Sequence, residues 1–130
     1  MAIQASQPLK ISLVAGADLS AKQFYFVKLN SSGQAVVCAA VTDIPVGILQ
    51  NTPASGSVAE VTVVGVSKVS SDAGLTAGNQ IGTSADGQAA AYTAGTDTTK
   101  YIVGQMLTTT GAAAVIGTAV INCVAPSRAA

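Results

Sequence analysis

The chain contains no histidine and no tryptophan, and only 9% of its 130 residues are charged. Without histidine, a Ser-His-Asp triad, a Cys-His pair, a histidine general base and any zinc or haem site that uses histidine are excluded. Six Lys plus Arg balance six Asp plus Glu, so the chain offers no strongly basic surface to a phosphate backbone. We therefore expect no direct binding of nucleic acid.

The acidic residues do not suggest a catalytic or metal site either. Asp72, Asp86 and Asp97 lie among Ser, Thr and Gly, where Asp forms hydrogen bonds with the local backbone of turns. The glycine-rich stretches 74–78 and 82–87 lack the Lys-Ser/Thr pair of a phosphate-binding loop. We predict no enzymatic activity, no catalytic residue, no cofactor and no metal.

Long apolar runs are missing as well. Residues 101–127 carry no charge, but Gln105, Thr108, Gly111 and Asn122 are among the residues that interrupt them. A membrane helix needs roughly 18 to 20 consecutive apolar residues. The stretch therefore predicts buried strands rather than a membrane span. The first ten residues lack the pattern of a secretory signal, and we expect synthesis in the cytoplasm.

The two cysteines, Cys38 and Cys123, lie in apolar, strand-like contexts. Free cysteine in such a context behaves as a small buried hydrophobic residue. A disulfide would form only if their strands paired, and a reducing cytosol opposes it. Both alternatives stay open from the sequence, and neither gives cysteine a catalytic role.

Apolar residues make up 49% of the chain, which is high for a domain with so few charges. A domain of this size buries only about two-thirds of the surface of its unfolded chain. Much of the remaining apolar surface is then expected to lie against further copies of the chain or against a partner. The composition favours a structural protein that works in an assembly.

An internal duplication organises the sequence, and repeats of this kind are sought before any motif. Each half has a polar lead, a strand, a glycine turn, a returning strand, a Val-Gly strand and a β-branched strand. A duplicated biotinyl or lipoyl carrier would need a lysine at a hairpin tip, and the tips at 32–33 and 86–87 carry none. The matching segments are 18–21 with 74–77, 32–35 with 86–89, 46–49 with 103–107, and 58–64 with 115–121.

These patterns predict an all-β fold, a small β-barrel or sandwich built from two similar halves. We expect an extended N-terminal arm at 1–17, one β domain at 18–125 with repeats at about 18–64 and 74–121, and a tail at 126–130. Closing the halves against each other would remove open sheet edges and give an approximate internal twofold. The expected strands are 24–29, 34–41, 46–50, 58–69, 80–83, 88–92, 101–107 and 115–124.

The arm and the tyrosines are the candidate contact residues. The arm lies outside the repeat and alternates weakly in polarity, as expected for a strand that adds to another sheet edge; a frayed tail is the alternative. Aromatic residues concentrate at interface hot spots; the alternative, which the strand contexts favour, is that each tyrosine is an ordinary half-buried strand residue. The candidates are Ile3, Leu9, Ile11, Leu13 and Val14 in the arm, with Tyr25, Tyr92 and Tyr101.

Turn and strand motifs spread over residues 15–124 resemble those of the head decoration proteins of tailed bacteriophages, also called capsid cement proteins. The resemblance implies an accessory subunit with a small β-barrel or β-tulip-like sandwich fold, often a homotrimer. Such a subunit binds the major capsid protein on the outer surface of the head and stabilises the shell by bridging capsid subunits. It would have no catalytic residues and no membrane contact. The motifs lie at 15–19, 45–51, 54–56, 61–69, 75–81 and 86–89.

A second kind of virion part, such as the base of a head fibre or a tail-tube subunit, is the alternative. Both alternatives share self-association without enzymatic activity. A tail-tube subunit would polymerise into rings or tubes, whereas a decoration protein would stay a small oligomer until it meets a shell. The sequence leaves the shell partner and the occupied symmetry positions open.

Overall fold

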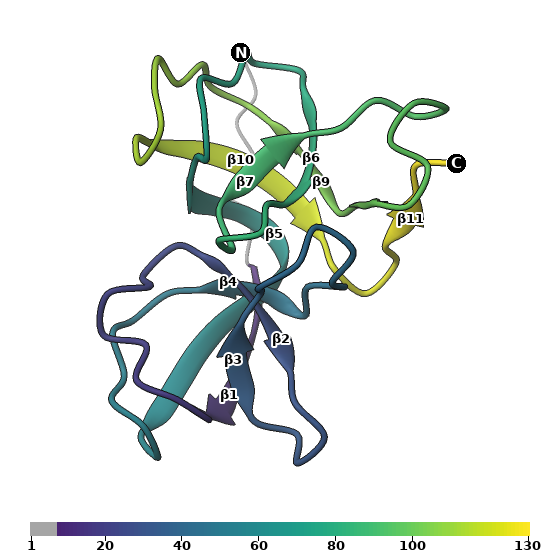
Figure 1. Cartoon of the computed structure of the whole chain (residues 1–130). Coiled ribbons are helices and arrows are strands. Elements are labelled where there is room, and N and C mark those ends of the chain that lie inside the picture. Colours follow the sequence, from purple (N-terminus) through teal and green to yellow (C-terminus); the bar gives the residue numbers. More distant parts are fainter. Residues whose placement is uncertain (1–7) are drawn as a thin grey trace.

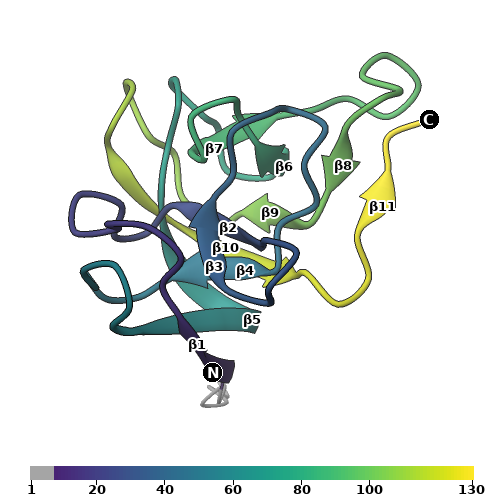
Figure 2. The same cartoon turned by 60° about the horizontal axis from the view of Figure 1, so that its bottom comes forward.

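The computed structural model describes residues 8–130, which form eleven strands and no helix (Figure 1). Nine strands build one antiparallel sheet in the order β3-β2-β4-β5-β10-β9-β6-β7, with β1 added beside β5. β8 and β11 form a separate two-stranded ribbon, which stands apart from the main sheet in Figure 2. The strands are β1 (Leu9–Val14), β2 (Phe26–Leu29), β3 (Ala35–Val37), β4 (Gly47–Leu49), β5 (Val58–Ser70), β6 (Gln80–Thr83), β7 (Ala89–Ala91), β8 (Tyr101–Ile102), β9 (Gly104–Met106), β10 (Ile116–Asn122) and β11 (Ser127–Arg128).

The two halves of the chain are built in the same way, which confirms the predicted all-β fold of two similar units. In the first half β2 pairs with β3 and β4, and β4 pairs with β5. In the second half β6 pairs with β7 and β9, and β9 pairs with β10. β5 and β10 pair with each other at the centre. From either edge of the sheet to its centre, equivalent strands therefore follow one another in the same order. β3, β2, β4 and β5 of the first half correspond to β7, β6, β9 and β10 of the second.

Each half also curls back toward closure. A parallel bridge joins Ala15, just after β1, to Ala35 in β3, and an equivalent bridge joins Ser71, just after β5, to Ala89 in β7. These bridges bring the outer strands of each half together, so that the sheet forms two small barrel-like lobes (Figure 1). Curling of this kind covers edges that an open sheet would expose.

The long strand β5 belongs to both lobes. Its first half pairs with β1 and β4, and its second half pairs with β10. The two parts meet at Val64, which is the partner of both Leu9 and Asn122. A Cβ atom on the next residue, Gly65, would lie 2.9 Å from the Cα of Pro8. Glycine here lets the chain entering β1 pass directly over β5.

The register of the repeat differs from the sequence alignment by one residue. Leu49 pairs with Val61 and Met106 with Ala119, so Val61 corresponds to Ala119, whereas the alignment of 58–64 on 115–121 pairs it with Thr118. The connection before the last strand explains the shift, because it spans 50–57 in the first half and 107–115, one residue more, in the second. Side chains along a strand alternate between its two faces, so an alignment that is wrong by one residue matches inward-facing residues with outward-facing ones.

One hydrophobic core runs through both lobes. Its largest fully buried side chains come from five strands of the sheet and from the loop between β1 and β2. Cys38 and Cys123 belong to the same cluster as free, buried thiols. Full burial of a Phe, Leu or Ile side chain contributes about 1.5–3 kcal/mol, so the shared core couples the stability of the two halves. These side chains are Phe26, Leu19, Ile48, Leu49, Ile81, Met106 and Ile121.

Candidate interaction surface

The described part of the predicted arm is a strand of the domain's own sheet. Leu9, Ile11, Leu13 and Val14 lie in β1 and pair with β5 of the same chain. Ile11 and Leu13 pack against the core, whereas Leu9 and Val14 are exposed. Leu9 and Val14 therefore offer more side-chain surface to a partner than Ile11 and Leu13 do. Ile3 lies outside the described residues.

The three tyrosines have different surroundings. Tyr92 is buried, and its hydroxyl donates a hydrogen bond of 2.6 Å to the carbonyl oxygen of Thr83. Burial, with the carboxylates of Asp97 and Asp72 nearby, raises the pKa of Tyr92 to about 12. Tyr92 is thus part of the interior. Tyr25 and Tyr101 are half-buried and belong to different halves of the chain.

A row of four outward-facing residues crosses the second half of the sheet. Gln80 pairs with Gln105, Gln105 with Val120, and Val120 with Val66. All four side chains are exposed, and they come in turn from β6, β9, β10 and β5. Directly opposite residues in neighbouring strands lie side by side on one face, so the four side chains form one continuous surface, which we call the Val120 row. Carboxamides lie at one end of the row and valines at the other.

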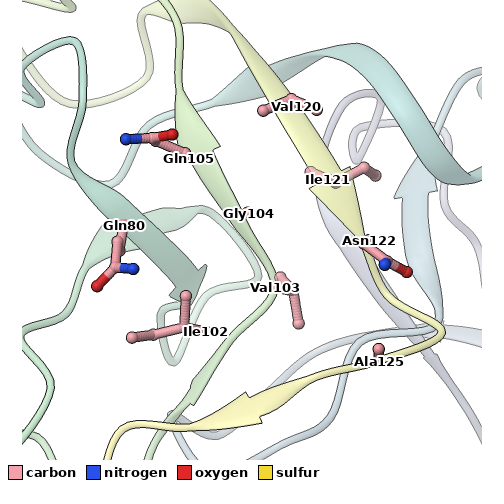
Figure 3. Close-up of a pocket in the computed structure, with 9 residues that line it drawn as sticks. All are labelled: Gln80, Ile102, Val103, Gly104, Gln105, Val120, Ile121, Asn122 and Ala125. Carbon is pink, nitrogen blue, oxygen red and sulfur yellow. The ribbon is translucent and has the colours of Figure 1, made fainter.

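An open depression of about 310 Å³ adjoins the Val120 row (Figure 3). It lies where the chain leaves β10 after Asn122 and where β8 separates from β9. Ile102 and Ala125 contribute apolar atoms on the side of the β8–β11 ribbon. No charged residue is among those that line it. The depression is therefore neutral, with carboxamides beside apolar side chains.

Of the three side-chain amides that line this depression, one donates a hydrogen bond to another residue within 8–130. Gln105 donates its side-chain amide to the carbonyl oxygen of Gly78 at 3.0 Å. Within residues 8–130, no hydrogen bond from another residue engages the side-chain amide of Gln80 or Asn122. An amide carries both donors and an acceptor, so Gln80 and Asn122 can satisfy a polar partner brought against them.

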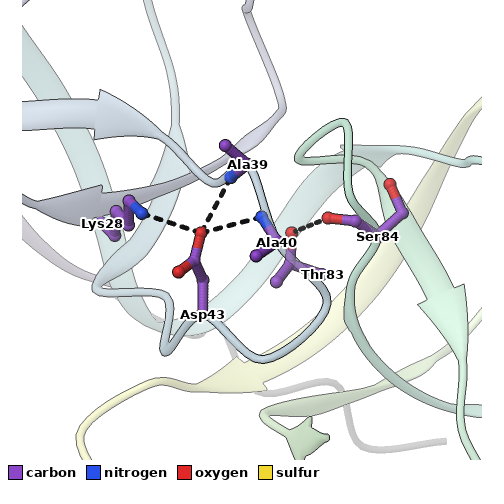
Figure 4. A network of polar contacts seen from close by, with 6 residues as sticks. All are labelled: Lys28, Ala39, Ala40, Asp43, Thr83 and Ser84. Atoms are coloured by element: carbon purple, nitrogen blue, oxygen red, sulfur yellow. Dashed lines mark hydrogen bonds and ion pairs between the residues drawn. The ribbon is translucent and has the colours of Figure 1, made fainter.

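The clearest polar network has a structural role (Figure 4). Asp43 Oδ2 accepts hydrogen bonds from Lys28 Nζ at 2.9 Å and from the backbone amides of Ala39 and Ala40 at 2.8 and 3.0 Å. Burial acts to raise the pKa of Asp43, but these hydrogen bonds outweigh it and hold the pKa below 3.8. Through Oδ2 the carboxylate fixes the loop between β3 and β4, which is a structural role.

The thiols are equally unsuited to chemistry. Burial raises the pKa of Cys38 and of Cys123 to about 12, and thiols are nucleophiles only as thiolates. Among residues 8–130, no group of three or more acidic, cysteine or histidine residues is placed to hold a metal ion. The same residues include no helix with the length and apolarity that crossing a bilayer requires.

The row was not among the sequence-predicted contacts, although part of its signal was present. Alternation within 116–122 already groups Ile116, Thr118, Val120 and Asn122 on one face of a strand. What the sequence does not reveal is that Val120 lies beside Gln105 and Val66. Those neighbours depend on pairings between segments that are far apart along the chain.

Comparisons with known proteins give likenesses to solved structures alone. No family model matches the chain, and no curated protein matches it. Five solved chains match its structure. One is the head fiber gp8.5 N base in bacteriophage phi29, with a TM-score of 0.65 and 16% sequence identity. The likeness covers 94% of this chain and 98% of the solved chain, so the two share a fold along nearly their whole lengths.

Proposed function

We propose that this protein is a structural subunit on the head of a bacteriophage virion, and that it serves as the base of a head fibre. The observation that carries the proposal is the structural likeness to the head fiber gp8.5 N base in bacteriophage phi29, which extends over 94% of this chain. A likeness confined to one lobe would carry less weight, because small β-barrels host many functions. Here both lobes and their shared strand are included.

The chemistry of the chain supports a role in binding without catalysis. The thiols are buried with raised pKa values, and the engaged carboxylate of Asp43 fixes a loop. With no histidine in the sequence, the common general base of enzymes is missing. We therefore propose a protein that binds without catalysing a reaction and takes no cofactor.

The proposed partner is the major capsid protein on the outer surface of the head, and the proposed assembly is a homotrimer. A capsid presents the same site many times, so a trimer can engage several equivalent sites at once. Linked binding events gain effective concentration and raise the overall affinity without a new type of contact. A base of this kind can hold a fibre with individually weak, uncharged contacts.

A second candidate is a decoration or cement protein, which the sequence motifs at 45–51 and 61–69 favour. The two roles make different demands on the same fold. A cement protein has to bridge neighbouring capsid subunits and oppose rupture, whereas a fibre base has only to stay attached. The likeness in fold supports the fibre base more directly than it supports the cement protein.

The test is co-sedimentation of the purified protein with expanded heads of the same phage, followed by heating of the decorated heads. A fibre base is expected to saturate the heads and leave their disruption temperature within about 2 °C of bare heads. A disruption temperature more than about 5 °C above that of bare heads would overturn the fibre base and support the cement role. Failure to sediment with any head form, while light scattering shows a folded protein, would overturn the head-associated function itself.

A further inference from the structure

We infer that the depression beside the Val120 row is a binding site for an extended, uncharged segment of polypeptide. The inference rests on the proposed function and deepens it, because it names the face of the domain that meets the capsid protein. It uses residues of β5, β6, β9 and β10, none of which was among the predicted contacts.

The charge of the site selects against ionic partners. Its lining contains carboxamides and apolar side chains but no Lys, Arg, Asp or Glu. A buried charge needs a partner of opposite sign or hydrogen bonds that replace its hydration. A phosphate, a nucleic acid or a charged helix would find no such partner here. A segment of uncharged residues would bring no charge into the site.

The hydrogen-bonding groups match a peptide backbone. The amides of Gln80 and Asn122 offer donors and acceptors, as does each peptide group of an extended chain. They lie on different strands, β6 and β10, with Gln105 and Val120 on the strands around the depression (Figure 3). No aromatic ring lines the site, so a nucleobase would find no stacking platform. The apolar atoms of Val120 and Ile102 suit small aliphatic side chains.

The size and openness fit a passing segment rather than an enclosed small molecule. The volume of about 310 Å³ is at the low end of the roughly 300–1,000 Å³ of ligand pockets. One end continues onto the exposed side chains of Val120 and Val66, which pair directly. A few residues of an extended segment can therefore occupy the depression while the chain continues across the valine surface.

The decisive variant is Val120→Asp, which places a charge in the row. Its matched control is Leu29→Asp, at a position on β2 in the other half of the sheet. Val120 is 39% exposed and Leu29 is 48% exposed, so the two substitutions cost the fold similar amounts. Thermal unfolding of each variant checks this equivalence. If Val120→Asp does not fold, Val120→Thr keeps the side-chain shape and introduces only a hydroxyl.

Binding is measured by co-sedimentation with expanded heads over a range of protein concentrations. We expect Val120→Asp to weaken binding at least tenfold and Leu29→Asp to bind as the unsubstituted protein does; for Val120→Thr we expect a loss of a few fold. Equal binding by all forms would overturn the site and leave the head-associated function standing. Absence of binding by the unsubstituted protein would overturn the proposed function.

A crosslinking experiment identifies the occupant. The native cysteines are 1% and 7% exposed, so a maleimide–benzophenone label attaches at Gln80→Cys and, as a control, at Leu29→Cys. Irradiation on heads is expected to join position 80 to a segment of the capsid protein that lacks charged residues. A crosslink only to a charged segment, equal crosslinking from both positions, or binding of neutral glycans that Val120→Asp removes would each overturn the inference.

Discussion

Alanine at Gly47 or Gly104 is predicted to disrupt the two lobes in the same way. The two glycines lie at equivalent places, at the start of β4 and of β9. A Cβ atom on Gly47 would overlap the carbonyl oxygen of Thr62, and one on Gly104 would overlap the carbonyl oxygen of Val120. Because both obstacles are backbone atoms of a paired strand, no side-chain rotation can relieve the overlap.

The expected cost is about 3 kcal/mol for each variant. Overpacking of a well-packed interior costs about 1–3 kcal/mol, and here the neighbouring strand has to move as well. In a domain of this size, that change lowers the melting temperature by about 10 °C. Gly111→Ala is the matched control, since a Cβ atom there meets nothing within 4 Å. Its effect is expected to stay within about 0.5 kcal/mol.

Thermal and urea unfolding, followed by circular dichroism, measure these changes. Because one core joins the lobes, each variant is expected to unfold in a single transition shifted to lower temperature. Two separate transitions in Gly47→Ala would refute the shared core. A Gly47→Ala or Gly104→Ala variant as stable as Gly111→Ala would refute the close approach of the strands.

Three further substitutions or treatments test the interior. Asp43→Ala is expected to cost about 2 kcal/mol at neutral pH, because the carboxylate accepts three hydrogen bonds while its ion pair stays partly exposed. Because the pKa of Asp43 is lowered in the folded protein, this stabilisation is present above the pKa of the unfolded chain and is lost as the pH falls through the folded pKa; an Asp43→Ala difference in urea midpoint that grows as the pH is lowered from neutrality would contradict the assignment. Tyr92→Phe removes a buried hydrogen bond and should cost about 1–2 kcal/mol, and an unchanged urea midpoint would count against the bond. Cys38 and Cys123 should resist iodoacetamide at pH 8 until the protein is unfolded, and rapid labelling of the native protein would show that the thiols are accessible.

Local chemistry explains why the fold class and several turns could be predicted. Asn30–Gly33 and Ser84–Gly87 both end in a glycine with positive φ. In both turns the first residue's side-chain oxygen accepts backbone hydrogen bonds. Turn chemistry of this kind is visible in four residues, and the repeat made it visible twice.

Properties that depend on distant pairings could not be predicted in the same way. The predicted strand at 101–107 is divided at Val103, and its first part, β8, pairs with β11 in a segment that was predicted to be a tail. The one-residue shift between the repeats has a similar origin, because runs of Val, Thr and Ala offer several registers with nearly equal burial. The Val120 row depends on both the register and the order of strands, so it emerges only from the assembled sheet.

Cryo-electron microscopy of expanded heads reconstituted with the purified protein tests the central claim most directly. The account predicts ordered two-lobed density on the outer surface of the shell, with the β6–β9–β10 face toward the capsid protein. Heads that show no added density under saturating protein would contradict a head-associated function. Density attached through the opposite lobe, with Val120 facing solvent, would keep that function and contradict the proposed face.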